Sequence, residues 1–176
     1  MYRQLLALSF IVCCLHASGQ EKGSAVKGTS AAIEYDHVGA PMPPLRLVTV
    51  DSPIRVYSTK DFDSKANLFV MMFNPLCGHC EDQAEHLVKN IGVFKRSKVI
   101  MMIDPQTQVY LPNFITAFHL KDHADVITVG VDSSGFIKNT FLYQALPQVN
   151  IYNSERRLIK TYTGGVLTDT LMQYIE

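Results

Sequence analysis

The sequence has no tryptophan, no excess of either charge and no apolar run long enough to cross a membrane comfortably. Lysine plus arginine and aspartate plus glutamate number 16 each, and the basic residues form no stripe. Because nucleic-acid-binding domains carry clustered positive charge, we expect no nucleic acid among the partners of this chain. Internal repeats are also absent. A length of 176 residues suits one domain with a real hydrophobic core.

The longest predominantly apolar segment lies near the beginning of the chain. Arg3 is followed by the apolar run 5–15, which one serine interrupts, and then by the small residues 17–19. The run has the length of a signal-peptide core, and small residues stand where a signal peptidase cuts. We therefore predict that residues 1–19 are a signal peptide, that the mature chain begins at Gln20, and that it is periplasmic or otherwise extracytoplasmic. A membrane anchor or a buried strand is the alternative interpretation of this segment.

Only two of the four cysteines lie outside this N-terminal segment. Cys13 and Cys14 stand at the end of the apolar run, where a lipoprotein carries its lipid-acceptor cysteine. The bulky residues 11–12 before them are a poor match to that signal, so a membrane-tethered lipoprotein is kept as an alternative. Removal of the signal peptide takes away one arginine and no acid, which leaves a net charge of 15 − 16 = −1. Any disulfide within the mature monomer must then join Cys77 and Cys80.

A stretch rich in glycine, serine and proline separates the signal peptide from the rest of the chain. Residues 20–37 contain few large apolar side chains and predict a flexible linker. Residues 39–44 cannot continue a helix and predict an extended segment that leads into the fold. We expect residues 38–176 to form one domain.

Strand and helix patterns alternate through that domain. The runs 68–73 (LFVMMF) and 99–103 (VIMMI) are continuously apolar, as expected for strands buried on both faces. Predicted strands are 45–50, 68–73, 99–103, 125–131, 149–152 and 158–162, and helical spacing of apolar residues predicts helices at 80–96, 109–120, 136–143 and 167–175. This order predicts an α/β fold, in which a central mixed sheet with a parallel centre and an antiparallel C-terminal edge carries helices on both faces.

The motif Cys77-Gly78-His79-Cys80 follows the first buried strand and stands at the start of a predicted helix. Zinc sites also use CxxC, but they need four ligands, and no second cysteine pair exists in the mature chain. Unpaired N–H groups and the helix dipole favour a thiolate at a helix N-terminus, and the thiolate is the attacking species. We therefore predict a redox-active pair. The alternative is that a Cys77–Cys80 disulfide only stabilises the start of the helix. A disulfide that closes a loop of four residues restrains little of the chain, however, and contributes little stability.

The two residues between the cysteines have separate predicted roles in redox tuning. Gly78 keeps the turn open and leaves room for the backbone of a partner. His79 can carry positive charge beside the thiolate, which would make the pair more oxidising than a pair with an apolar linker. In the predicted cycle, Cys77 attacks a partner disulfide and Cys80 then attacks the mixed disulfide. The same steps can run in reverse, so these residues do not determine the direction of exchange.

Segments spread over the domain resemble the thioredoxin-like superfamily, and most closely its exported TlpA-like and AhpC/TSA-like branch. The matching segments are 38–43 (VGAPMP), 68–80 (LFVMMFNPLCGHC), Leu146-Pro147 with the strand after it, and Gly164-Gly165 before the last helix. The resemblance implies a thioredoxin-like three-layer sandwich and a thiol–disulfide oxidoreductase of the protein-disulfide reductase type. It implies that Cys77 is the nucleophile, that Cys80 is the resolving thiol, and that Pro147 faces them in a cis peptide bond. Leu146 and Pro147 would then bind the substrate peptide.

Three positions depart from the pattern of that family. Residues 74–76 (NPL) stand where a tryptophan often precedes the first cysteine, and Met71 stands at the position of the buried acid of thioredoxins. Gln83 aligns with the acid that related exported reductases place one turn after the second cysteine. The acidic residues on the predicted helix are spaced as a solvated face, so the sequence names no general base. The CGHC linker resembles that of protein disulfide isomerases, which argues against a purely reducing role.

Other functions would need other residues. A peroxide reductase of the same fold carries a Pro-x-x-x-Thr-x-x-Cys pattern, which is absent here. A copper-binding or copper-delivery module could use Cys77, Cys80, His79 and His86 together with methionines. However, several methionines lie in apolar strands, where they fill space, and we expect His86 at the surface. A redox-inactive binding protein on this fold stays open as a third class.

The predicted chemistry needs few additional components. We expect no resident cofactor and no metal. The expected partners are protein thiols and disulfides, together with a membrane or periplasmic electron donor. We expect the protein to be a monomer.

Overall fold

The computed structural model describes residues 34–62, 65–94, 96–142 and 145–176. The predicted signal peptide, and the predicted linker up to residue 33, lie outside the described residues. Those two assignments therefore stay predictions. Within the described ranges, no helix combines the length and the apolarity that a membrane span requires.

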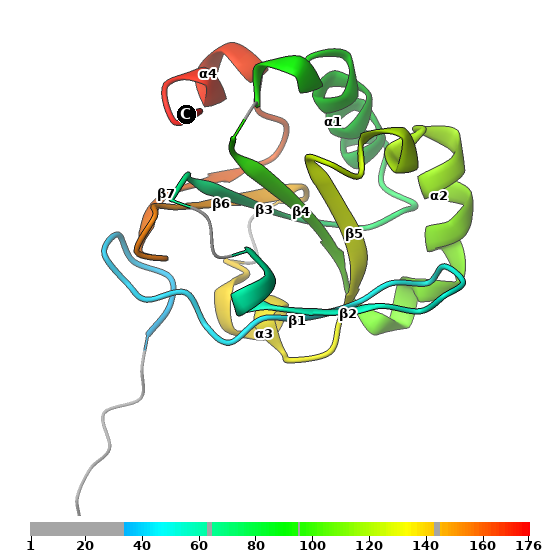
Figure 1. Ribbon diagram of the computed structural model, residues 1–176, viewed down its shortest axis with the longest axis horizontal. Coiled ribbons are helices and arrows are strands. Elements are labelled where there is room, and N and C mark those ends of the chain that lie inside the picture. Colours follow the sequence, from blue (N-terminus) through cyan, green and yellow to red (C-terminus); the bar gives the residue numbers. More distant parts are fainter. Residues whose placement is uncertain (1–33, 63–64, 95, 143–144) are drawn as a thin grey trace, which may run out of the picture. The chain divides into compact units, whose positions relative to one another are not determined.

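The fold is built on one seven-stranded sheet (Figure 1). The strands are β1 (Arg46–Val48), β2 (Val56–Ser58), β3 (Leu68–Phe73), β4 (Lys98–Ile103), β5 (Ile127–Asp132), β6 (Gln148–Tyr152) and β7 (Leu158–Thr163). They lie in the order β2-β1-β5-β4-β3-β6-β7. The three central strands β5, β4 and β3 are parallel, whereas β6 and β7 form an antiparallel edge beside β3. The predicted parallel centre and antiparallel C-terminal edge are confirmed.

The two apolar runs form the middle of the sheet. Every residue of β3 is buried, and so is every residue of β4 after Lys98. Successive side chains of a strand point to opposite faces. The odd-numbered residues of β3 therefore join one hydrophobic cluster and the even-numbered residues join another. A strand that serves two cores needs the continuous apolar run seen in the sequence.

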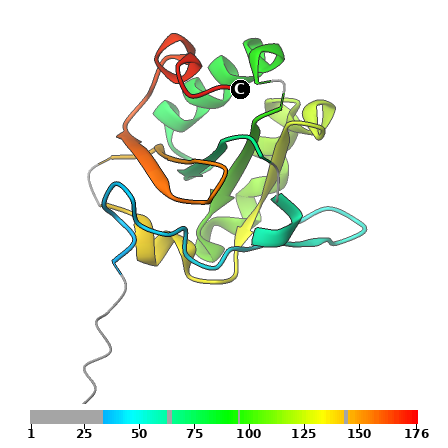
Figure 2. The same cartoon turned by 60° about the vertical axis from the view of Figure 1, so that its left-hand side comes forward.

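Helices cover both faces of the sheet. α1 (Gly78–Lys89), α2 (Leu111–Ala117) and α4 (Thr168–Met172) pack into the cluster that holds the odd-numbered residues of β3. α3 (Phe136–Thr140) and the 3-10 turn η1 (Thr59–Phe62) pack into the other cluster. Figure 2 shows α3, in yellow, across the sheet from α1, in green, and from α4, in red. The predicted three-layer α/β sandwich is confirmed.

The first long helix is shorter than the prediction of residues 80–96. α1 ends at Lys89, and a separate 3-10 turn, η2 (Ile91–Val93), follows it. Asn90 leaves the helical conformation at φ −112° and ψ 14°, and its side-chain amide donates to the His86 carbonyl at 2.8 Å. Apolar spacing continues past this break because Phe94 still packs in the core. Periodicity alone therefore predicted one uninterrupted helix.

The predicted helix 109–120 is three short pieces, namely η3 (Pro105–Tyr110), α2 and η4 (Leu120–His123). Asp104 begins η3 by accepting a hydrogen bond from the Gln106 N–H at 2.9 Å. Pro112 lies in the first turn of α2, where its missing N–H is tolerated. His119 adopts the left-handed conformation with φ 52° and separates α2 from η4. Such local features leave no trace in the apolar spacing.

The remaining differences concern element ends and one hairpin. The predicted helices 136–143 and 167–175 are observed as the shorter α3 and α4. The predicted strand 45–50 is β1, and its antiparallel partner β2 was not predicted because it is only three residues long and contains no fully buried residue. The extended segment before β1 is as predicted, since Gly39 and Met42 donate to the carbonyls of Leu158 and Arg156 at 2.8 Å each.

Candidate active site

Cys77 lies where β3 passes into α1. It is the N-cap residue of the helix, with φ −103° and ψ 115°. Its carbonyl accepts hydrogen bonds from the N–H groups of Cys80 and Glu81 at 2.9 and 3.0 Å, and its own N–H donates to the Asn74 carbonyl at 3.1 Å. The residue is half-buried, whereas Cys80 is buried. The predicted position of Cys77 at a helix N-terminus, where the helix dipole favours negative charge, is confirmed.

Cys80 lies one helical turn deeper and is fully buried. It packs in the hydrophobic cluster with Ala84 and Leu87 of the same helix. Burial raises the pKa of the Cys80 thiol above its usual value, and the neighbouring side chain of Cys77 raises that pKa further. The backbone of Asn74 lowers the same pKa by a smaller amount. Cys80 therefore stays protonated at neutral pH and must lose a proton before it can attack a sulfur.

The loop before β6 faces the first cysteine. The Leu146–Pro147 peptide bond is cis, and the Leu146 carbonyl oxygen lies 4.0 Å from the Cys77 Sγ atom. Pro147 is buried, whereas Leu146 is half-buried. The loop that the family resemblance singled out therefore stands against the sulfur expected to react. The peptide-binding role of Leu146 and Pro147 stays a proposal.

The two linker residues occupy the exposed first turn of α1. No atom lies within 4 Å of a Cβ built on Gly78, so the surface beside the cysteines is open at this position. His79 is exposed and lines a surface cavity of about 280 Å³ together with His86 and residues 165–167. The tuning roles of Gly78 and His79 stay predictions.

Comparison with known proteins rests on solved structures, because no family model and no curated protein matches this chain. The thioredoxin domain of a thiol-disulfide oxidoreductase from Bacteroides vulgatus matches with a TM-score of 0.63 and 13% identity, over 80% of this chain and 99% of that one. A thiol:disulfide interchange protein from Bacteroides sp. matches with a TM-score of 0.62 and 14% identity, over 80% and 91% of the two chains. An exposed lipoprotein thioredoxin from Streptococcus pneumoniae matches with a TM-score of 0.57 and 20% identity, over 74% and 96%.

The fold is thioredoxin-like. The expectation that came from the family resemblance is therefore confirmed for the fold. At these identities the likeness concerns the fold, and the chemistry must be argued from the residues of this chain. The decisive residues within the thioredoxin-like fold are the two cysteines and the polar groups that surround them.

Two polar side chains of α1 hold the loop that leads into α4. Gln83 is buried, and its Oε1 atom accepts a hydrogen bond from the Val166 N–H at 2.6 Å. His86 is half-buried, and its Nε2 atom accepts from the Thr168 N–H at 3.0 Å. His86 is partly exposed, as expected for a surface residue, and its ring in addition accepts a hydrogen bond at the start of α4. Gln83 and His86 stand three positions apart on one helix face, which is a signal that sequence reasoning could have used.

Asn74 organises the turn that brings Cys77 to the helix. Its Oδ1 atom accepts from the Leu76 N–H at 2.9 Å, and its carbonyl accepts from the Cys77 N–H. Side-chain acceptance two residues ahead is the usual way in which asparagine stabilises a turn. Leu76 is 62% exposed directly before the cysteine. An asparagine-centred turn and an exposed leucine therefore occupy the segment where family members often carry tryptophan.

No buried acid packs against Cys80 in the part of the chain that the structure describes, and the exposed neighbour Glu81 raises the pKa of Cys80 through its charge. Glu81, Asp82 and Glu85 are exposed, as predicted, and Met71 is a core residue at 2% exposure. The buried carboxylate among the described residues is Asp132, which accepts from the N–H groups of Ser134 and Ile137 at 2.9 Å each. It is engaged at the start of α3. The expectation that no general base can be named is consistent with these positions.

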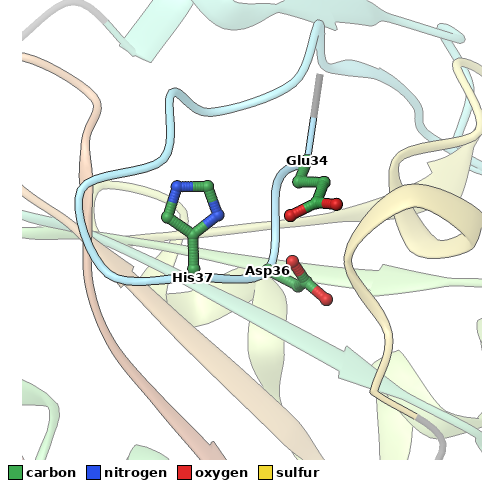
Figure 3. A group of neighbouring side chains, drawn as sticks. All are labelled: Glu34, Asp36 and His37. Atoms are coloured by element: carbon green, nitrogen blue, oxygen red, sulfur yellow. The ribbon is translucent and has the colours of Figure 1, made fainter. Parts of the chain in front are cut away.

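Potential metal ligands gather elsewhere on the molecule. Among the described residues, Glu34, Asp36 and His37 are the group of three whose ligand atoms lie within 4.8 Å of one another (Figure 3). All three are exposed and come from one short stretch before β1. Cys77, Cys80, His79 and His86 form no such group in the described part of the chain. The geometry thus lends no support to the copper-binding alternative at the cysteine pair.

Proposed function

We propose that this protein is a thiol–disulfide oxidoreductase of the protein-disulfide reductase type, which exchanges disulfides through Cys77 and Cys80. The observation that carries the proposal is the pairing of a half-buried Cys77 at the N-cap of α1 with a fully buried Cys80 one turn later. Dithiol exchange needs an accessible sulfur that attacks and a protected sulfur that resolves. Structures of the same fold that are described as thiol-disulfide oxidoreductases support the proposal.

The proposed reaction has two exchange steps. The Cys77 thiolate attacks one sulfur of a partner disulfide, which breaks the S–S bond and releases the other sulfur as a thiolate. Cys80 then loses its proton and attacks the Cys77 sulfur, which forms the Cys77–Cys80 disulfide and releases the second partner thiolate. Both released thiolates take up protons according to their pKa. Two electrons pass from the protein to the substrate, and an external dithiol reductant must restore the Cys77–Cys80 dithiol.

Matched cysteine variants test this function. We expect the protein to accelerate reduction of insulin disulfides by dithiothreitol, and we expect Cys77→Ser to lower the rate to that of dithiothreitol alone. Cys80→Ser should also lose turnover, but it should accumulate a mixed disulfide between Cys77 and insulin, visible by mass spectrometry without reductant. A chelator should not change the rate. Equal activity of Cys77→Ser and the unsubstituted protein would contradict the assignment.

The proposed setting is extracytoplasmic, with protein thiols and disulfides as substrates and a monomeric protein. The predicted signal peptide supports this setting, and so does the exposed lipoprotein thioredoxin among proteins of the same fold. N-terminal sequencing of protein recovered from cells tests the prediction. A mature chain that begins at Gln20 supports signal cleavage. A lipid-modified N-terminus at Cys13 or Cys14 would replace it with the lipoprotein alternative.

A further inference from the structure

A cavity of about 490 Å³ lies beside the cysteine pair. Its volume falls within the range of about 300–1,000 Å³ that is usual for specific pockets. Three parts of the fold meet there, namely the end of β3 with Asn74 after it, the segment after β4, and α3 with Phe141 and Leu146. The residues that matter for the argument are Met72, Asn74, Thr107, Ile137, Phe141 and Leu146.

Two residues belong both to the wall of the cavity and to the surroundings of Cys77. Leu146 lines the cavity, and its carbonyl oxygen is 4.0 Å from the Cys77 Sγ atom. Asn74 lines the cavity, and its carbonyl accepts from the Cys77 N–H at 3.1 Å. A polypeptide whose disulfide is attacked by Cys77 must therefore pass close to the mouth of the cavity. The natural occupant is a side chain of that same polypeptide.

The cavity has an apolar floor and a charge-balanced rim. Met72 is 1% exposed at the floor, and its thioether can adapt to different shapes. Ile137, Phe141 and Leu146 are only half-buried, so part of their apolar surface faces water until an occupant covers it. The two charged lining residues, Asp104 and Lys138, are both exposed and of opposite sign. This lining suits an uncharged apolar side chain better than a charged one.

The wall formed by α3 is held at both ends by buried polar side chains. At its start, Asp132 accepts from the Ile137 N–H at 2.9 Å. At its end, the fully buried Gln148 accepts from the Leu142 N–H at 2.9 Å and donates to the Thr140 carbonyl at 2.8 Å. Gln148 also donates to the Asn150 Oδ1 atom at 2.9 Å, so both N–H groups of its side-chain amide are used. The cavity is thus formed before an occupant arrives, which lowers the entropic cost of binding.

We propose that this cavity is a specificity subsite, which takes one large apolar side chain, such as phenylalanine, near the reacting cysteine of the protein substrate. An aromatic side chain has about 150–250 Å² to bury, and the half-buried Ile137, Phe141 and Leu146 supply part of the apolar surface that would cover it. The inference rests on the proposed function, since the occupant is delivered by a polypeptide whose disulfide Cys77 attacks. We therefore expect the reaction rate to depend on one apolar side chain of the substrate and not on the overall hydrophobicity of the substrate.

Peptide disulfides of defined sequence test the subsite. The substrates are serine-rich pentapeptides with a central cysteine in mixed disulfide with glutathione, in which one flanking serine is replaced by Phe, Glu or Lys at each of the four positions in turn. Reduced protein is mixed with each peptide, and the second-order rate constant of a single turnover is measured by chromatography. Each rate constant is divided by that of the same protein with hydroxyethyl disulfide, which removes general effects on Cys77.

We expect Phe at one position to raise the normalised rate constant about tenfold over Ser, a usual size for apolar side-chain discrimination in a pocket. Glu and Lys at that position should give no gain. Ile137→Asp, which puts a charge into the wall, and Thr107→Trp, which fills the cavity from its rim, should each lower the Phe preference to less than about threefold. The two variants act from different elements, so misfolding of one leaves the other as a test. Val109→Asp is the matched control, because Val109 is 71% exposed on η3 and does not line the cavity.

Each other outcome has a definite meaning. A Phe preference below twofold at every position overturns the subsite, and so does an equal or larger gain with Glu or Lys. Equal loss of preference in Val109→Asp and Ile137→Asp also overturns it, because general surface hydrophobicity would then explain the effect. If the protein does not reduce hydroxyethyl disulfide in a Cys77-dependent manner, the proposed function fails instead of the subsite alone.

Discussion

At the scale of single residues, the two cysteines of the motif differ in their surroundings. Cys77 lies at the N-cap of α1 with its sulfur near the Leu146 carbonyl, whereas Cys80 is fully buried in the core. Burial is the largest cause of the raised Cys80 pKa, and we expect it to persist in the mixed disulfide because Cys80 is buried by core residues of this chain. Deprotonation of Cys80 is therefore the demanding step of the second exchange, and the charge of the adjacent Glu81 raises the pKa of Cys80 further.

We predict that resolution of the mixed disulfide accelerates steadily with pH. The thiolate is the nucleophile, and the pKa of Cys80 is raised from 9.0. Below the pKa, the ionised fraction grows tenfold for each pH unit, so the rate should rise about tenfold per unit from pH 7 to pH 9 without a plateau. The measurement is glutathione release from protein trapped as the Cys77–glutathione mixed disulfide, with Cys80→Ser as the control that releases none. A plateau at or below pH 8 would mean that another group takes the proton from Cys80.

At the scale of elements, α4 depends on α1. A helix of five residues has little stability of its own. Its start is fixed because Gln83 and His86, both on α1, accept hydrogen bonds from Val166 and Thr168. α1 carries the cysteines at its N-terminal end, and two side chains further along α1 fix the start of α4. At position 83, where the family resemblance implies an acid, this chain carries an amide that accepts a structural hydrogen bond.

Loss of the His86 ring should weaken this attachment. We expect His86→Ala to lower the free energy of unfolding by about 1 kcal/mol, the usual contribution of one hydrogen bond, with faster hydrogen exchange at the Thr168 amide. Asp82→Ala is the matched control, because Asp82 is exposed on the same helix. Urea unfolding and exchange monitored by NMR provide the measurements. An unchanged Thr168 exchange rate in His86→Ala would show that the ring does not hold α4.

At the scale of the whole described fold, the β1–β2 hairpin is joined to the parallel centre through β5. β1 pairs with β5 at Leu47–Asp132 and Val48–Val131. The approach is close at Gly130, where an added Cβ would stand 2.6 Å from the Val48 carbonyl oxygen and 2.8 Å from the Leu47 Cγ atom. Glycine is needed at position 130, because the Val48 backbone, unlike a flexible side chain, cannot move away from an added Cβ.

We predict that Gly130→Ala destabilises the protein by about 2 kcal/mol, in the range for overpacked interiors. The matched control is Gly92→Ala, because no atom lies within 4 Å of a Cβ built on Gly92. Chemical unfolding of both variants gives the comparison. Equal stability of Gly130→Ala and Gly92→Ala would show that the β1–β2 hairpin can move away from β5 without loss of stability, and would contradict the close packing inferred here.

Much of the fold could be predicted because its evidence is local in the chain. The two continuous apolar runs identify β3 and β4, and the change from a buried strand to helical spacing places the cysteine motif at a helix start. Element ends were less predictable. Asn90 and His119 end helices through backbone conformations that apolar spacing does not record. The short strand β2 was missed because a strand of three residues is too short to show an alternation of apolar and polar side chains.

The sequence by itself determined the place of the CGHC motif at a helix start, the order of the other strands and main helices and the two-faced core, because each follows from neighbours along the chain. Only the tertiary structure decided what the buried polar side chains do. Gln83 and His86 meet their partners 83 and 82 positions away, and the cavity beside Cys77 is assembled from three separate segments. Contacts at such separations depend on how the sheet and helices pack, and a single sequence records no spacing that reveals them.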